Sequence, residues 1–271
     1  MSKETNNVVV LVPILNFDCD EDLVKLDHTL SIRRTSPDEI KDMIKQFPNY
    51  PLLSAVGDAK YVIEKEGIST EIRKEYFSER TADAEKTTLA FRLLSIDKTW
   101  MPTAFYVSAD SLYVSNPFTN RITVDDVCSI LHREQIEEFQ TIWNALNIAD
   151  KKKPYLVFAL SQFTRSFEDS TEEQFVDYIT AFESIVFGRG TNAPSPYGRA
   201  IGIAVGMLIG KKEKERKSIE QRLNEAYEIR NKVVHGHLHH KLGDPDDEKL
   251  LKLATFTKDC LVKCLKKLLT E

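Results

Sequence analysis

The chain has 271 residues, of which 42% are hydrophobic and 29% charged, a balance typical of a folded protein rather than a disordered one. This length fits one large domain or two ordinary ones. The longest strongly apolar run, Ile201 to Ile209, is much shorter than the roughly 20 residues of a membrane-spanning helix, so we expect no membrane segment. The first seven residues are polar and lack a secretion signal, which makes the cytoplasm the expected location.

The charges are distributed unevenly along the chain. The net charge is -5, but residues 1–150 contain 16 Lys and Arg against 25 Asp and Glu, whereas residues 151–271 contain 21 against 17. Only the second half therefore has the charge balance that suits a polyanionic partner.

The four cysteines do not form a recognised motif. Cys19 and Cys128 are isolated, and Cys260 and Cys264 are four residues apart in a helical pattern. This spacing is neither that of a zinc site nor that of a disulfide framework. Because free cysteine is commonly buried, we expect all four to be packing residues.

The first 130 residues mix strand and helix signals. Strands are expected at 8–12, 28–34, 104–107 and 112–115, with the last two paired across a turn at 108–111. Ser36-Pro37-Asp38-Glu39 predicts the start of a short helix that ends near Phe47. This half contains no phosphate-binding loop, dinucleotide motif or zinc helix. We therefore expect an N-terminal mixed α/β domain over 1–129, to which the sequence assigns no chemistry.

From residue 130 the pattern is entirely helical. Helices are expected over 132–147, 154–168, 171–187, 197–209, 213–235 and 246–269. The sequence thus predicts an α+β protein in which residues 130–271 form an all-α helical bundle. In helix 197–209 every fourth residue is glycine: Gly198, Gly202, Gly206 and, just beyond its end, Gly210. Each interior glycine costs a helix about 1 kcal/mol relative to alanine, so the stripe predicts the close approach of another backbone.

Two charged residues interrupt apolar helix faces. Arg230 lies on the stripe of Ile219 and Leu223, and Glu183 lies beside Ile179 on another helix. A charge placed toward a core needs an opposite charge or a cleft, so we expect Glu183 to pair with Arg230. The pair is either a structural ion bridge or one side of a polar site, and the sequence leaves both open.

Histidines are concentrated just after Arg230. Four of the six fall within six residues: His235, His237, His239 and His240. Gly236 suits the position after a helix end, which places His235 in the last turn, where its simplest role is a C-terminal cap. The three later histidines could bind a transition metal weakly, but no carboxylate or cysteine stands at ligand spacing. We expect neither a metal nor a cofactor.

The segment 227–236, which contains Arg230, Asn231 and His235, resembles the signature of HEPN domains, helical bundles that include many metal-independent ribonucleases. Their motif is an arginine, usually followed by a polar residue, and then a histidine after four to six intervening residues. The stretch 155–186 is similar to the Apea-like branch of this family. His237 also satisfies the spacing, but the Val-His-Gly context favours His235.

The resemblance, which covers roughly 130–271, implies an endoribonuclease in which the 2'-hydroxyl of RNA attacks its own phosphate. His235 would transfer a proton, Arg230 would stabilise the charge of the transition state, and Asn231 would orient either one. Candidate supporting residues are Glu183, Tyr227 and His237. Candidate RNA-binding residues are Lys211, Lys212 and Lys232, although acidic neighbours also fit a solvated helix face.

Five helical steps place His235 about 140° around an ideal helix from Arg230, so one helix does not readily direct both at one phosphate. The resemblance implies that two protomers bring their motifs together, which predicts a homodimer with a composite active site. It also implies a role in phage defence or a stress response. The alternative is a non-catalytic HEPN-type module for dimerisation or RNA binding, because a fold does not fix a function. A small-molecule sensor in the N-terminal half is a further alternative. The sequence assigns neither the RNA that is cleaved nor the signal that controls cleavage.

Overall fold

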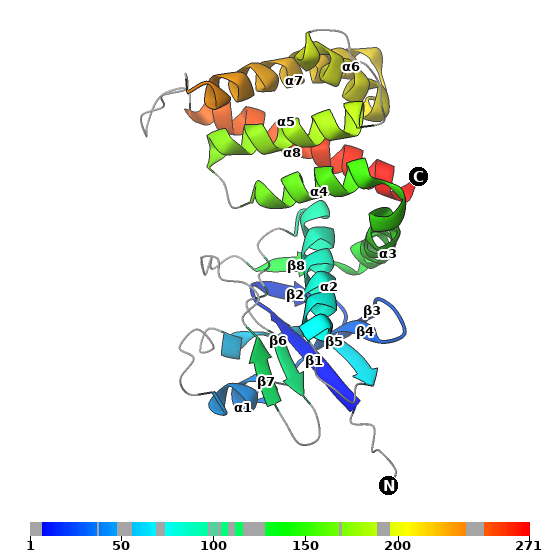
Figure 1. Cartoon of the computed structure of the whole chain (residues 1–271), viewed down its shortest axis with the longest axis vertical. Coiled ribbons are helices and arrows are strands. Elements are labelled where there is room, and N and C mark those ends of the chain that lie inside the picture. Colours follow the sequence, from blue (N-terminus) through cyan, green and yellow to red (C-terminus); the bar gives the residue numbers. More distant parts are fainter. Residues whose placement is uncertain are drawn as a thin grey trace. The chain divides into compact units, whose positions relative to one another are not determined.

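A computed structural model describes residues 7–36, 38–47, 56–68, 74–96, 99, 101, 104–107, 112–115, 128–167, 170–188, 196–236 and 247–271. The chain divides into two compact units, Met1–Asn144 and Ala145–Glu271. The first combines strands and helices and the second is helical, which confirms the expected α+β class (Figure 1). Among the helices of the ranges above, none is both long and apolar enough to cross a membrane.

A six-stranded antiparallel sheet forms the centre of the first unit. In spatial order its strands are β3 (Leu23–Lys25), β4 (Leu30–Arg34), β5 (Tyr61–Ile68), β1 (Asn7–Ile14), β6 (Ala104–Val107) and β7 (Leu112–Ser115). The four expected strands all lie in this sheet, and the expected pairing of β6 with β7 is confirmed by the register of Ala104 with Ser115. The turn expected at 108–111 lies outside the described residues.

Helices cover both faces of the central strand β1, which explains its unbroken apolar sequence. On one face, Leu11 packs in a core with Ile40 and Met43 of α1 (Glu39–Lys45). On the other face, Lys65, which lies opposite Val10 in the register, forms an ion pair with Asp83 of α2 (Lys74–Leu93). Helix α2 crosses the sheet in Figure 1.

The two units divide inside a helix. Before the division lie β2 (Phe17–Cys19), its parallel partner β8 (Ser129–Leu131) and a 3-10 turn (Arg133–Gln135), and the division itself falls within α3 (Ile136–Lys152). The ring of Phe139 in α3 stacks on Phe91 of α2, with centroids 4.9 Å apart. Because the start of α3 packs in the first unit, the division follows Asn144 rather than the expected boundary at 129/130.

The helical unit contains the helices that follow α3: α4 (Pro154–Arg165), α5 (Thr171–Phe187), α6 (Tyr197–Ile209), α7 (Glu213–Val234) and α8 (Asp247–Thr270). Their bounds lie within three residues of those expected from the sequence. The expected helix 132–147 differs more, because residues 133–135 form a 3-10 turn and α3 continues to Lys152.

The glycines of α6 face α7, as the sequence predicts. A Cβ atom placed on Gly202 would lie 2.7 Å from both the Cα atom and the carbonyl oxygen of Glu220, and one on Gly198 would lie 2.8 Å from the Cβ atom of Tyr227. No side chain fits at these distances. The stripe therefore lets the α7 backbone approach α6 and fixes the position of Tyr227.

The cysteines are free thiols, and three of them are buried: Cys19, Cys260 and Cys264. Cys128 is exposed, so the expectation that it is a packing residue was wrong; it precedes β8 and lies outside the core. We expect iodoacetamide at mildly alkaline pH to label Cys128 in the folded protein and the other three only after denaturation. Mass-spectrometric peptide mapping checks this, and labelling of Cys264 at the rate of Cys128 would contradict it.

Candidate active site

The expected contact between Arg230 and Glu183 is present. Glu183 lies on α5 and Arg230 on α7, and an Nη atom of Arg230 is 3.6 Å from a carboxylate oxygen of Glu183. Both side chains are half-buried, with 23% of Arg230 and 28% of Glu183 exposed. The separation exceeds that of a direct hydrogen bond, so the attraction is mainly that of two charges at the rim of the apolar core.

The hydrogen bonds of the Arg230 guanidinium are incomplete. Its Nη1 atom donates to the side-chain oxygen of Asn231 at 3.2 Å, so two of the predicted site residues are in direct contact. Its Nε atom is buried and has no hydrogen-bond partner among the described residues. A buried N–H that lacks an acceptor is costly, so the guanidinium is not fully satisfied by the residues around it.

The ring of Tyr227, on the same helix, lies beside the guanidinium, and a second aromatic pair lies between α5 and α6. The central carbon of the guanidinium is 5.8 Å from the centroid of the Tyr227 ring, and Tyr197 of α6 packs edge-on against Phe187 with centroids 5.8 Å apart. Burial and then the negative charge of Glu183 raise the pKa of Tyr227, while Arg230 acts in the opposite direction. Tyr227 therefore remains a neutral hydroxyl at physiological pH, able to donate or accept a hydrogen bond.

His235 lies at the end of α7, as expected. The helix ends at Val234, the backbone N–H of His235 donates to the carbonyl of Asn231 at 3.0 Å, and Gly236 follows with a φ of 68°. This left-handed conformation favours glycine and ends the helix. The side chain of His235 is exposed, whereas that of Arg230 is half-buried against Glu183 of α5, so the two side chains have different surroundings. His237, His239 and His240 lie outside the described residues.

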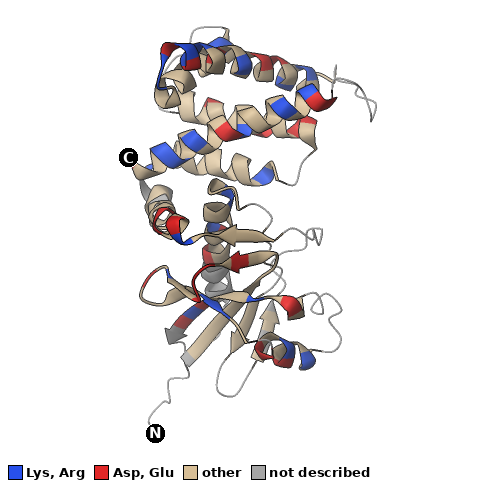
Figure 2. Ribbon diagram, turned by 180° about the vertical axis from the view of Figure 1, so that it is seen from behind, with Lys and Arg blue, Asp and Glu red and all other residues tan. Residues whose placement is uncertain are grey.

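The structure separates the candidate RNA-binding lysines. Lys232 is exposed and close to Arg230 in sequence, but Lys211 and Lys212 precede the other end of α7. At 1.5 Å per residue, Lys212 is about 27 Å along the helix axis from Arg230. Basic and acidic residues are interleaved along α7 and α8 (Figure 2). Lys211 and Lys212 therefore do not belong to the group around Arg230.

Two features of this unit were not identified from the sequence. Tyr197 of α6 interacts electrostatically with Tyr227, and the only signal for it is the adjacent Gly198, which lets Tyr227 pack closely. Asp177 of α5 is completely buried and forms an ion pair with Arg165 of α4. A buried carboxylate needs such a partner, so this pair fixes α4 against α5 and supports the helix that carries Glu183.

Replacing Glu183 with alanine is expected to lower the free energy of unfolding by about 1 to 2 kcal/mol, because it leaves a half-buried guanidinium without its carboxylate. Glu220→Ala is a matched control: Glu220 is also 28% exposed, but its partner Arg199 is 66% exposed. Because the ion pair between Glu220 and Arg199 is exposed to solvent, its loss should lower the free energy of unfolding by less than about 1 kcal/mol. Urea titrations followed by circular dichroism measure both, and equal losses would refute a special role for the Arg230 pair.

No protein-family model, curated protein or solved structure matches this chain. The fold and the site define an α+β protein whose helical unit holds a half-buried arginine, an adjacent asparagine and a helix-terminal histidine. Within the described residues, no three potential metal ligands of the His, Cys, Asp and Glu types come together.

Proposed function

We propose that the chain is a metal-independent endoribonuclease of the HEPN type that acts as a homodimer. The observation that supports this most is the state of Arg230. Its Nε atom is buried without a partner, and its nearest carboxylate contact is 3.6 Å long. Because the side chain is 23% exposed and its contact with Glu183 is long, its terminal N–H groups keep hydrogen-bonding capacity for a phosphate, which arginine can bind in a bidentate manner.

The chemistry needs three groups. As the 2'-oxygen of RNA forms a bond to phosphorus, its proton passes to a base, and the bond from phosphorus to the 5'-oxygen breaks as that oxygen receives a proton. Histidine can perform either proton transfer near neutral pH, which suits His235. Arg230 would stabilise the negative charge on the phosphorus oxygens, and Asn231 would hold Arg230 in place. The products carry a 2',3'-cyclic phosphate and a 5'-hydroxyl.

Incubation of the purified chain with total RNA in EDTA tests the proposal. We expect fragments whose ends are a 2',3'-cyclic phosphate and a 5'-hydroxyl, because the RNA supplies its own nucleophile. Fragments with 3'-hydroxyl and 5'-phosphate ends, or no cleavage over a range of RNA and protein concentrations, would overturn the mechanism.

The alternative is a non-catalytic module that dimerises or binds RNA. The contact between Arg230 and Glu183 favours it, because an ion pair at the rim of a core can be purely structural. RNA that is retained in a gel-shift assay but remains intact would support this alternative over the ribonuclease.

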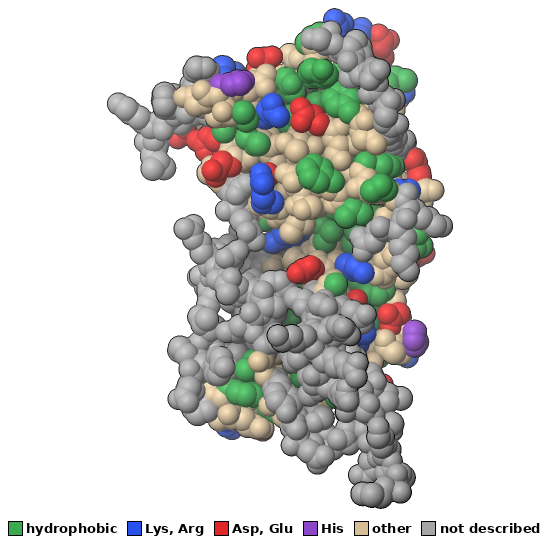
Figure 3. Space-filling view, viewed as in Figure 1, with side chains coloured by type: hydrophobic (Ala, Val, Ile, Leu, Met, Phe, Trp, Pro, Cys, Tyr) green, Lys and Arg blue, Asp and Glu red, His purple; other side chains and the backbone are tan. Residues whose placement is uncertain are grey.

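We expect the chain to be a dimer whose interface includes the region from Arg230 to His235, because His235 and Arg230 point in different directions from one helix. Exposed hydrophobic side chains flank this region: Tyr197 is 48% exposed and Val234 is 52% exposed. Hydrophobic side chains also gather on the face of the helical unit seen in Figure 3. Light scattering at tens of micromolar measures the mass, and a monomer at all concentrations would contradict the composite site.

A further inference from the structure

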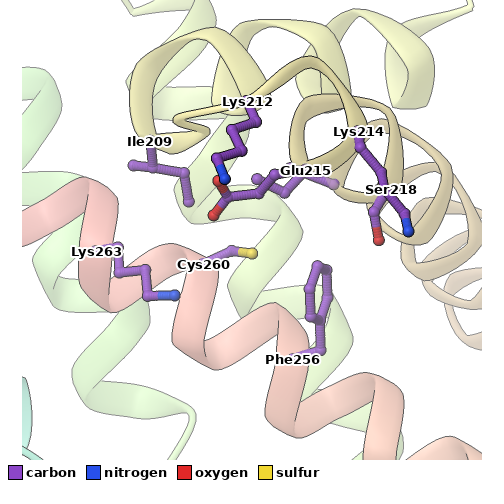
Figure 4. A pocket seen from close by; sticks show the side chains of 9 residues that line it. Ile209, Lys212, Lys214, Glu215, Ser218, Phe256, Cys260 and Lys263 are labelled. Atoms are coloured by element: carbon purple, nitrogen blue, oxygen red, sulfur yellow. The ribbon is translucent and has the colours of Figure 1, made fainter.

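A pocket of about 360 Å³ lies near the start of α7, at the opposite end of this helix from His235. The end of α6, the first turns of α7 and part of α8 surround it (Figure 4). Its lining residues are Ile209, Lys212, Lys214, Glu215, Ser218, Ile219, Phe256, Cys260 and Lys263. The volume lies at the lower end of the range for small-ligand sites, so the pocket suits a small molecule.

Three lining residues, Ile219, Phe256 and Cys260, form an apolar wall. Ile219 and Cys260 are buried, and burial raises the pKa of Cys260 to about 12, so its thiol remains neutral. The guanidinium of Arg222 lies 3.7 Å from the centroid of the Phe256 ring and donates to the carbonyl of Lys252 at 3.3 Å, which holds the ring in its orientation. Because the apolar wall carries no charge and no strong hydrogen-bonding group, it suits the hydrocarbon part of a ligand.

The charged lining residues stand on two sides of the pocket. Figure 4 shows Glu215, Lys212 and Lys263 toward one side, and Lys214 toward the other. Glu215 accepts a hydrogen bond from the backbone N–H of Lys211 at 2.8 Å. The side that holds Lys212 and Lys263 therefore already contains a carboxylate, which would repel a second one.

The opposite side combines a cation with a hydroxyl. Lys214 and Ser218 are four residues apart in α7, so their side chains lie on the same face of the helix. Within the part of the chain that the structure describes, Lys214 forms no ion pair, whereas Lys217 pairs with Glu213 at 2.8 Å. An ammonium group and a hydroxyl can each donate a charge-assisted hydrogen bond to one carboxylate.

We propose that this pocket binds a small amphipathic carboxylic acid, with its carboxylate on Lys214 and Ser218 and its hydrocarbon part against the apolar wall. The lining has three lysines and one glutamate, so its net charge favours an anion. A carboxylate placed at Lys214 lies across the pocket from Glu215, which keeps the two negative charges apart. The hydrocarbon part is either aliphatic or aromatic. The proposal does not rest on ribonuclease activity, because the pocket and His235 lie at opposite ends of α7.

Isothermal titration calorimetry with the full chain tests the proposal. The two candidate ligands are octanoate, which has an aliphatic chain, and phenylacetate, which has an aromatic ring. Octanamide keeps the chain of octanoate without its charge, and acetate keeps the charge without the chain. AMP is titrated as a ligand of another class.

Two variants change the pocket, and a third serves as the control. Lys214→Met removes the charge and keeps most of the side-chain length, and Ser218→Phe removes the hydroxyl and fills the pocket. Lys217→Met is the matched control, because Lys217 is 69% exposed on the same helix but does not line the pocket. Circular dichroism checks the folding of each variant, and Lys214→Met alone decides the matter if Ser218→Phe does not fold.

We expect each pocket variant to weaken binding of the acid at least about tenfold and Lys217→Met to change it less than about twofold. Tighter binding of octanoate identifies an aliphatic acid, and tighter binding of phenylacetate an aromatic one. The proposal is overturned if neither acid binds, if octanamide or acetate binds as tightly as octanoate, if AMP binds more tightly than both acids, or if Lys217→Met loses as much as Lys214→Met. The EDTA cleavage assay tests the ribonuclease proposal separately.

Discussion

Replacing His235 or Arg230 with alanine is expected to lower the rate of RNA cleavage at least about a hundredfold, the usual scale for losing an acid–base or charge-stabilising group. His235 is exposed at the end of α7, so its loss leaves no cavity and the fold should be retained. Arg230 is half-buried beside Glu183, so Arg230→Lys is a second variant that keeps the charge but loses the bidentate geometry. Single-turnover cleavage of a labelled RNA measures each effect.

His237→Ala is the matched control, because His237 satisfies the same sequence spacing but follows Gly236, at which α7 has already ended. It should lose much less activity than His235→Ala. Full activity in His235→Ala would reject that residue as the proton-transfer group. If neither Arg230→Ala nor His235→Ala reduces cleavage, the ribonuclease assignment fails and the binding module becomes the better interpretation.

Mixing the two inactive variants tests the composite site directly. If Arg230 of one protomer acts with His235 of the other, a mixed dimer of Arg230→Ala and His235→Ala protomers contains one intact site. Random mixing should then restore about a quarter of the parental activity. No recovery after the subunits have exchanged would show that the two residues do not combine in this way.

The helical unit was predictable because its signals are local. The apolar residues of α7 recur at helical spacing, and Gly236 ends the helix at the residue where a left-handed conformation is needed. The contact between Glu183 and Arg230 was also predictable, since two opposite charges on apolar stripes stabilise each other when their helices pack.

The missed elements depend on contacts between distant residues. Apolar and polar residues do not alternate regularly along β5, because three consecutive charged residues, 64–66, follow its apolar start. Arg33 pairs with Glu64 and Asp83 pairs with Lys65, and both partners come from elsewhere in the unit. The sequence of α2 is largely polar, so its helix carries no clear apolar stripe. The burial of Asp177 likewise depends on Arg165 of α4, which no local spacing reveals.

Replacing Gly202 with alanine is expected to destabilise the helical unit by about 1 to 2 kcal/mol. The new Cβ atom would lie 2.7 Å from the Cα atom and the carbonyl oxygen of Glu220, so it meets the α7 backbone and not the flexible end of a side chain. Overpacking costs about 1 to 3 kcal/mol, and a contact with backbone atoms belongs to the upper part of this range, so it outweighs the gain of about 1 kcal/mol from the better helix propensity of alanine. The two helices must move apart, which would also shift Tyr227 and Arg230.

Gly206→Ala is the control on the same stripe. Its Cβ atom would lie 3.1 Å from the carbonyl oxygen and 3.4 Å from the Cα atom of Arg216, a contact that a shift of a few tenths of an ångström relieves. The gain in helix propensity then offsets the strain, and we expect a change within about 1 kcal/mol of zero. Urea titrations compare the two variants. If Gly202→Ala is as stable as Gly206→Ala, then the close contact of α6 with α7 does not limit the stability of the unit.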